Sequence, residues 1–325
     1  MQTILQMVQQ AEMELGLPSS VSVFGPGTQD NTGIQMGALA NRVLDELRRV
    51  GRWTAMQFEY NIVVQPPKDT TGDLLAESPV IQNIPSTTGL QPNYWQVAGP
   101  GIPVAARIKS VDSATQVTMD MENTNTTLVS GAAIQFMLDT YPVPSDFDYF
   151  NNRTMWDRTN RWELIGPDSP QIDQWHRSGI VATGPRRHFR KIGPYPNTFR
   201  IWPAPAEIAA PLQLSFEYLS LNAVAIQGND ADAAPFAEYF ANDADTCLLD
   251  ANAIIMGIKW MFWEVKGFGS YATLQQRWVD YVKRLLARDG ASPTLPLVNK
   301  TNPIFISPAN VQDGFFPGPV GPNQA

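Results

Sequence analysis

Apolar side chains between Asn242 and Arg288 follow a helical pattern with two faces. They recur at three- to four-residue steps in two series, which predicts one helix with two apolar stripes. The first series is Leu248, Ile255, Ile258, Phe262 and Val265, and the second is Leu249, Ala253, Met256, Trp260 and Trp263. A Lys-Gly-Phe-Gly break then leads into an amphipathic helix around Trp278. A helix that is apolar on two sides must be deeply buried or shared with a neighbour, and sharing points toward assembly rather than catalysis.

The N-terminal segment 1–53 predicts two more amphipathic helices. Apolar residues share one face over residues 3–15, and Gly16 ends that helix. A second helix is expected to start near Asp30, whose carboxylate can cap its first amides, and to end at Gly51. Together with the segment 231–290, these helices predict a helical bundle.

Basic side chains gather on the polar side and in the last turn of the second helix, at Arg42, Arg48 and Arg49. Cations near the C-terminus of a helix interact favourably with its dipole, which is one reason to find them there. The alternative is that these side chains face an acidic surface of a partner.

The pattern changes to β-strands across residues 54–230. Short runs rich in Val, Ile, Thr and aromatic residues, such as QVTMDM and LQLSFEYLS, are separated by turn residues. They predict a large, mainly antiparallel β region that is sandwich- or barrel-like. The stretch from about 78 to 137 has its own rhythm and predicts a small β module inserted into the larger one. The fold class is therefore α+β.

The segment 291–325 is rich in proline and predicts an extended tail rather than a helix or strand. A solvated linker would not need apolar anchors, so we expect another chain to hold this docking tail. Its anchors are Ile304, Phe305, Ile306, Phe315 and Phe316.

Charged residues make up only 17% of the 325 residues, and the formal net charge is −8. Globular domains average about 25% charged residues, so the low content favours burial of surface in an oligomer. The chain lacks the clustered Lys and Arg that grip duplex phosphates, although an acidic chain could line a passage through which DNA slides. No run of about 20 apolar residues predicts a membrane span. The N-terminus does not look like a signal peptide, so we expect a soluble protein made in a cytoplasm.

Candidate chemistry is sparse. His176 and His188 are the only histidines, and they form no ligand-spaced pair on one helix, so we predict surface or interface roles. Asp243 and Asp245 could serve a hydrolase, but capping the start of the apolar helix is the simpler role. Cys247 is the only cysteine and is expected to be a small buried side chain within that helix. We predict no catalytic residue, no cofactor and no metal.

Several short motifs together resemble the tail adaptor, or head-to-tail connector, proteins of short-tailed bacteriophages. The resemblance depends on the order of the motifs and covers most of residues 1–290. The motifs are LGLP, ELRRVGRW, YPVPSDFD, RTMWDRT, GPDSP, FRIWPAP, SFEYLS, NDADTCLLD, IKWMFWEVKGFGSYA and ARDG.

The resemblance implies a structural virion protein and not an enzyme. It implies a homo-oligomeric ring, typically a dodecamer, docked beneath the portal in the neck of the virion and assembled in the host cytoplasm. Such a ring extends the DNA channel, takes part in DNA ejection without sequence-specific DNA contacts, and supports the tail nozzle and fibres. We expect the tail to dock on the portal and the bundle core or subunit contacts to include Leu249, Met256, Trp260, Trp263 and Trp278.

A second interpretation is a carbohydrate- or receptor-binding module of a phage tail. It depends on the tryptophans scattered over the β region, which can stack on sugars but more often serve packing. They include Trp53, Trp95, Trp156, Trp162, Trp175 and Trp202.

Overall fold

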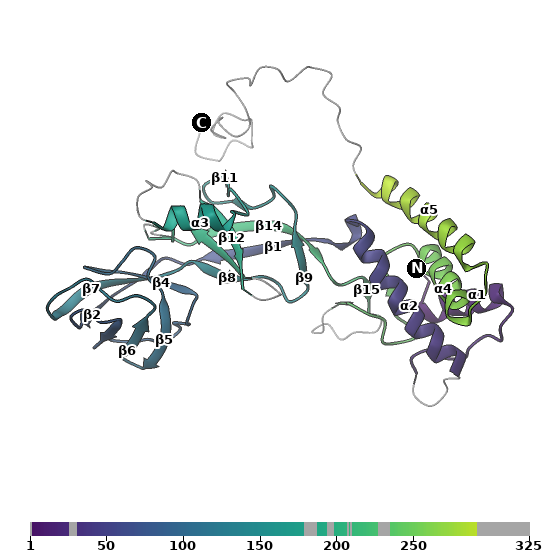
Figure 1. Ribbon diagram of the computed structural model, residues 1–325, viewed down its shortest axis with the longest axis horizontal. Helices are drawn as coiled ribbons and strands as arrows, with labels where there is room; N and C mark the ends of the chain where they lie inside the picture. The colour runs from purple at the N-terminus through teal and green to yellow at the C-terminus, as the bar shows by residue number, and fades with distance from the viewer. Residues whose placement is uncertain are drawn as a thin grey trace, which may run out of the picture. The chain divides into compact units, whose positions relative to one another are not determined.

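The computed structural model describes residues 2–25, 31–178, 187–193, 198–206, 208, 210–226 and 235–290. The described chain is α+β, as the sequence predicts (Figure 1). Along the sequence, helices α1 and α2 come first, most of the antiparallel strands follow, and helices α4 and α5 come last. It divides into two compact units, with boundaries within strands β1 (Gln57–Val64) and β14 (Leu212–Ser220) and on either side of residues 146–150. We call the described parts of 1–58, 146–150 and 218–290 the helical unit. The described parts of 59–145 and 151–217 are the β unit.

The N-terminal helices of the helical unit begin and end close to where the sequence predicts. Helix α1 (Ile4–Leu15) starts with a capping box between Thr3 and Gln6 and ends at Gly16, whose φ of 72° suits glycine. Helix α2 (Asn31–Val50) stops just before Gly51. The predicted cap of α2, Asp30, lies outside the described residues.

Helix α4 (Ala251–Lys266) lies at the centre of the helical unit. Asp250 caps its start, where Oδ1 accepts a hydrogen bond of 3.1 Å from the Ala253 amide, and Gly267 ends it. Helices α1, α2 and α5 (Tyr271–Asp289) all pack against α4 (Figure 1). The four helices share one apolar core with Phe240 and the short strands that follow β14.

The same chain covers most of the second apolar stripe that the sequence predicts. Trp260 is 3% exposed, and its ring lies 5.8 Å from the ring of Trp278 on α5. The Trp278 indole donates a 2.9 Å hydrogen bond to the Ala253 carbonyl. Leu249, Trp260 and Trp278 are buried, whereas Met256 and Trp263 are half-buried. Of the two ways to shelter this helix, the structure shows deep burial within one chain, so its apolar pattern does not by itself require a second copy.

The start of α4 differs from the sequence prediction. The helix begins at Ala251, so Asp243 and Asp245 precede it and Asp250 is the capping residue. Cys247 lies in strand β17 and not in the helix. That strand belongs to a small antiparallel sheet in the order β16-β15-β17, with bounds Phe236–Ala237, Val224–Ala225 and Thr246–Cys247. Hydrophobic periodicity extended the helix too far because a buried strand and a buried helix are both apolar.

One sheet follows the order β1-β14-β10-β11, with β9 also paired to β14. Its strands are β1 (Gln57–Val64), β14 (Leu212–Ser220), β10 (Trp156–Asp157), β11 (Trp162–Glu163) and β9 (Phe147–Phe150). A second sheet, within the β unit, has the order β12-β13-β8 with antiparallel pairing. Its bounds are His188–Ile192, Thr198–Trp202 and Thr140–Pro142. The β unit also holds helix α3 (Pro170–Arg177). In the helical unit, a 3-10 turn (Thr54–Met56) precedes β1.

An inserted β module (Lys68–Leu138) forms a six-stranded antiparallel sheet with its own apolar core. The strand order is β4-β7-β2-β3-β6-β5, with bounds Trp95–Ala98, Val129–Leu138, Lys68–Leu74, Val80–Gln82, Gln116–Met119 and Ile108–Ser113. The sequence places its start at about residue 78, but β2 at Lys68 already belongs to the sheet. That strand reads KDTTGDL and buries only Gly72 and Leu74, so it carries almost no apolar alternation.

A buried ion pair ties the inserted β module to the rest of the β unit. Arg107 and Asp139 are 6% and 1% exposed and share two hydrogen bonds of 2.7 Å each. The same guanidinium donates to the Asn93 carbonyl and to Thr140 Oγ1. The Ile201 amide of β13 donates to the Asp139 carbonyl at 2.8 Å. Bidentate geometry and further hydrogen bonds are what a buried pair needs to offset its desolvation.

No helix in the described part of the chain is long and apolar enough to cross a membrane.

We predict that Trp260→Ala lowers the free energy of unfolding by about 3–5 kcal/mol, because it removes a large buried side chain from a packed core. Chemical denaturation followed by circular dichroism measures this. The matched control on the same helix is Val265→Ala, whose side chain is 53% exposed. It should change stability by about 0.5 kcal/mol or less. Equal effects for the two variants would contradict the burial of Trp260.

Candidate functional site

The three arginines that the sequence offers as candidates for a partner contact do not share one environment. Arg48 is 6% exposed, so the prediction is wrong for this residue. Its guanidinium contacts Asp45 at 2.5 Å and Glu238 at 2.7 Å and donates to the Leu221 carbonyl at 3.2 Å. Burial disfavours the charged form, but the carboxylates of Glu238 and Asp45 more than offset it and raise the pKa of Arg48. Arg48 therefore joins α2 to the segments that follow β14.

Arg42 and Arg49 do lie at the surface. Their side chains are 58% and 73% exposed, and each pairs with an acid of α2, at 3.9 Å to Glu46 and 3.0 Å to Asp45. Exposed pairs of this kind are weak and can exchange for an external carboxylate. These two residues remain the basic candidates for a contact with an acidic surface.

The helical unit also exposes large apolar side chains. Six of them are at least half exposed: Met13, Val21, Ile34, Val50, Val265 and Phe268. Singly exposed apolar side chains are common on monomers. Here they are the groups that a neighbouring molecule could bury. The predicted docking anchors Ile304, Phe305, Ile306, Phe315 and Phe316 lie outside the described residues.

Asp243 holds the loop between α1 and α2 against the start of the C-terminal segment. Its carboxylate accepts hydrogen bonds from Ser22 Oγ at 2.6 Å and from the amides of Val23 at 2.8 Å and Phe24 at 2.7 Å. Burial opposes ionisation, but these three donors lower the pKa of Asp243 below its usual value. Asp245 accepts two further backbone amides, from Ala241 and Asn242. Both carboxylates therefore fix loops.

The thiol of Cys247 also makes contacts that hold the local structure. Its sulfur accepts a hydrogen bond from the Leu249 amide at 3.3 Å and contacts the Ala223 carbonyl. Burial raises the pKa of this thiol to about 12, so the reactive thiolate is scarce at neutral pH. Burial of Cys247 agrees with the sequence prediction, although its element is a strand.

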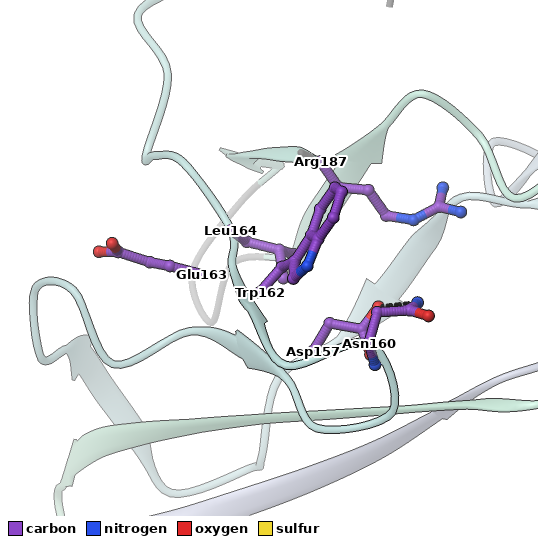
Figure 2. A pocket seen from close by; sticks show the side chains of 6 residues that line it. All are labelled: Asp157, Asn160, Trp162, Glu163, Leu164 and Arg187. Atoms are coloured by element: carbon purple, nitrogen blue, oxygen red, sulfur yellow. Dashed lines mark hydrogen bonds between the residues drawn. The ribbon is translucent and has the colours of Figure 1, made fainter. Parts of the chain in front are cut away.

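A pocket of about 330 Å³ opens in the β unit beside the β10–β11 hairpin (Figure 2). The lining residues are Asp157, Asn160, Trp162, Glu163, Leu164 and Arg187. The buried Asp157 carboxylate accepts from the amides of Thr159 and Asn160 and from Asn160 Nδ2 at 2.7 Å. Asp157 therefore holds the hairpin turn.

The remaining lining groups can offer an aromatic surface and two kinds of donor. Figure 2 shows the Trp162 ring between Leu164 and Asn160, with Glu163 pointing away from them. Glu163 instead lies 3.4 Å from Arg153. Arg187 donates to the Pro203 carbonyl at 2.9 Å, and burial lowers the pKa of its guanidinium. An indole beside an amide and a guanidinium suits a small polar ring compound such as a sugar.

The structure brings together three side chains that sequence reasoning did not connect. The ligand atoms of Asp168, His176 and His188 all lie within 4.8 Å of one another. His188 Nδ1 is 3.1 Å and His176 Nε2 is 3.9 Å from Asp168 Oδ2, and the two imidazole centroids are 4.4 Å apart. The side chains are 9%, 12% and 22% exposed, for Asp168, His176 and His188 respectively.

Three different elements carry these side chains. Asp168 precedes the cap of α3, His176 lies in the last turn of that helix, and His188 begins β12. The Asp168 amide donates to the Phe189 carbonyl at 2.9 Å, and Ile165 pairs in parallel with His188. Because the ligands come from a loop, a helix and a strand, no spacing on one element announces them. The GPDSP motif was the only local signal, and it marks a helix start.

No protein-family model matches the sequence, and no curated protein is significantly similar to it. The function is therefore inferred from the residues and contacts of this chain and from the resemblance of its motifs to tail adaptors.

We predict that Asp243→Ala lowers stability at pH 7 by about 1–2 kcal/mol, since it leaves two amides and a hydroxyl without their acceptor and the site is partly solvated. The folded-state pKa is lowered, so the contribution is complete above the unfolded pKa of about 3.9 and is lost as the pH falls through the folded value. Denaturation at pH 7 and near pH 3 tests this. The exposed control Asp148→Ala should match wild type at both values, and an equal loss in that variant would contradict the assignment.

Proposed function

We propose that the protein is a structural virion protein, an adaptor that forms a ring between the portal and the tail of a short-tailed phage. The observation that carries the proposal is the chain topology. Helices from both ends of the chain enclose α4 in one core, and the β unit is inserted between them. The resemblance implies this combination of a helical part and a β part. We infer that the four helices form a bundle and that the β region is sandwich- or barrel-like.

The motifs behind the resemblance make contacts that specify structure. Asp146 of YPVPSDFD accepts a 2.6 Å hydrogen bond from Ser220 of SFEYLS. Asp289 of ARDG accepts from the Thr54 amide at 2.6 Å, directly after ELRRVGRW. Asp243 of NDADTCLLD holds the loop that follows LGLP. Motifs that are far apart in the sequence therefore meet in the helical unit, which supports a scaffold role over a catalytic one.

The surface of the helical unit also supports assembly. Its exposed apolar side chains, among them Val21, Met13 and Phe268, can pack against sister copies or the portal. Arg42 and Arg49 can pair with acidic groups of a partner. The proposed partners are about twelve copies of the chain itself, the portal protein, and nozzle or fibre proteins. Genomic DNA would pass through the ring without sequence-specific contacts.

We expect the purified protein to form a complex with the portal protein encoded by the same genome, containing about twelve copies of the chain. Native mass spectrometry of the protein alone, the portal alone and the mixture measures this. A portal protein from an unrelated phage serves as the control. The absence of any complex with the cognate portal, together with absence of the chain from purified virions, would refute the proposal.

The proposed docking tail can be tested in the same mixture. We expect deletion of Thr294–Ala325 to weaken binding to the portal, because it removes all five apolar anchors. Circular dichroism and thermal unfolding should show the same helical core in the truncated protein. Docking as tight as that of the full chain would assign portal binding to the helical unit instead.

A second candidate function is binding of a carbohydrate, which the pocket beside Trp162 favours. Stacking on an exposed indole face supplies affinity for sugars with modest demands on geometry. We predict that any specific sugar found on a glycan array loses its binding in Trp162→Ala. The same sugar should still bind the control variant Trp175→Ala, because Trp175 is 57% exposed and lies outside the pocket. Sugar binding without affinity for the portal would rank this function first.

A further inference from the structure

We propose that Asp168, His176 and His188 bind a divalent transition-metal ion, with Zn²⁺ as the simplest occupant. The proposal does not depend on the adaptor function, because it uses only the geometry and chemistry of these side chains in the β unit. Their ligand atoms already face one another within 4.8 Å.

Two of the three separations are close to those of ligands around one ion, and the third is at most 4.8 Å. Four ligands placed tetrahedrally at zinc bond lengths lie about 3.4 Å from each other. His188 Nδ1 and His176 Nε2 lie 3.1 and 3.9 Å from Asp168 Oδ2. An ion between them therefore requires shifts of a few tenths of an ångström for these pairs, which side-chain rotation can supply.

The donor set selects the class of metal. Two imidazole nitrogens and one carboxylate oxygen favour Zn²⁺, Co²⁺, Ni²⁺ or Fe²⁺, whereas Mg²⁺ and Ca²⁺ prefer sites built from oxygen alone. Three protein ligands leave a coordination position for water or an external group, as in open zinc sites. The cluster is mostly shielded but keeps an opening at His188, whose side chain is 22% exposed.

The carriers of the three ligands are held before any ion arrives. Ser169 caps α3 by accepting from the Ile172 amide, and the Asp168 amide is bound to the Phe189 carbonyl. His188 pairs with Trp202 in the β12–β13 ladder. This prior ordering lowers the entropy cost of assembling a metal site.

The neighbouring carboxylate of Asp173 pairs with arginines and is not one of the three proposed ligands. Asp173 of α3 is 4% exposed and lies 2.5 Å from Arg190 of β12 and 3.9 Å from Arg200 of β13. These pairs fix α3 against the sheet, and the carboxylate offsets part of the positive charge of the two guanidiniums. Asp173 is therefore a positioning residue for the helix that carries His176. Metal binding at the cluster would join the same elements a second time.

Isothermal titration with ZnCl₂ on the full chain, stripped with a chelator and free of any histidine tag, tests the site. We expect one saturable equivalent of Zn²⁺ per chain, a rise in melting temperature on binding, and no binding of Mg²⁺ under the same conditions. Co²⁺ should give the visible absorption of a low-symmetry site. A plain hydrogen-bonded Asp–His pair predicts none of these signals.

Substitutions locate the ion. His176→Gln, His188→Gln and Asp168→Asn should each weaken Zn²⁺ binding by at least about tenfold, since even loss of a residue that supports a ligand costs that much. The matched control Asp148→Asn changes an exposed carboxylate in the helical unit and should bind like wild type. Circular dichroism checks that each variant is folded. Failure of the wild-type protein to bind Zn²⁺, or undiminished binding in folded variants, overturns the proposal, and neither result bears on portal binding.

Discussion

Helix α4 is apolar over most of its surface, and this constraint shapes the chain. Ile254, Ile258 and Met261 have no exposure to solvent at all. Such a helix needs cover on most of its sides, and α1, α2 and α5 supply it from opposite ends of the sequence. One row stays at least partly exposed: Asn252, Met256, Lys259 and Trp263. Gly257 permits a close approach of α4 to α2, because a Cβ at that position would collide with Val43. The two ends of the chain must therefore meet, and most of the chain between β1 and β14 becomes an insertion.

Polar side chains then fasten segments that the apolar core alone would leave loose. Asp146, Asp243, Asp245 and Asp289 all accept hydrogen bonds from residues outside their own helix or strand. In the β unit, the Arg107–Asp139 pair has the same role at the base of the inserted β module. A carboxylate that binds two or more donors gains far more than an exposed ion pair. The few charged residues of this protein thus contribute to architecture, which explains why acidic clusters that look catalytic in the sequence are structural.

Parts of this structure follow directly from local sequence patterns. The period of apolar residues and the terminal glycines locate α1, the end of α2 and the body of α4, because both signals act within one element. The burial of Trp260 also follows from its pattern, but the identity of its cover does not, since α5 meets it only in three dimensions. The same pattern cannot separate the strand at Cys247 from the helix at Ala251, as both are apolar. The apolar pattern does not predict strand β2, because its side chains are mostly polar.

The candidate sites were harder to foresee for a related reason. From its own helix alone, Arg48 is expected to be a surface cation. It is buried because Glu238 and Leu221, which are distant in the sequence, contact it. His176 and His188 look isolated until β12 pairs with the chain at Ile165 and brings them to Asp168. Composition identified which residue types were scarce, but contacts between distant elements decided their environment. Local periodicity contains no information about such contacts.

The insertion of the β unit has a consequence for biosynthesis. Helix α2 ends at Val50 and its main partner α4 begins at Ala251, so a ribosome must add about 200 residues before the two can pack. At ordinary elongation rates this takes about 10–40 s, during which the nascent N-terminal helices keep their apolar faces uncovered. The inserted β module, whose strands lie between Lys68 and Leu138, emerges whole in that interval. Cotranslational folding would thus begin in the middle of the polypeptide and finish at its two ends, and chaperones would have their longest opportunity to bind at α1 and α2.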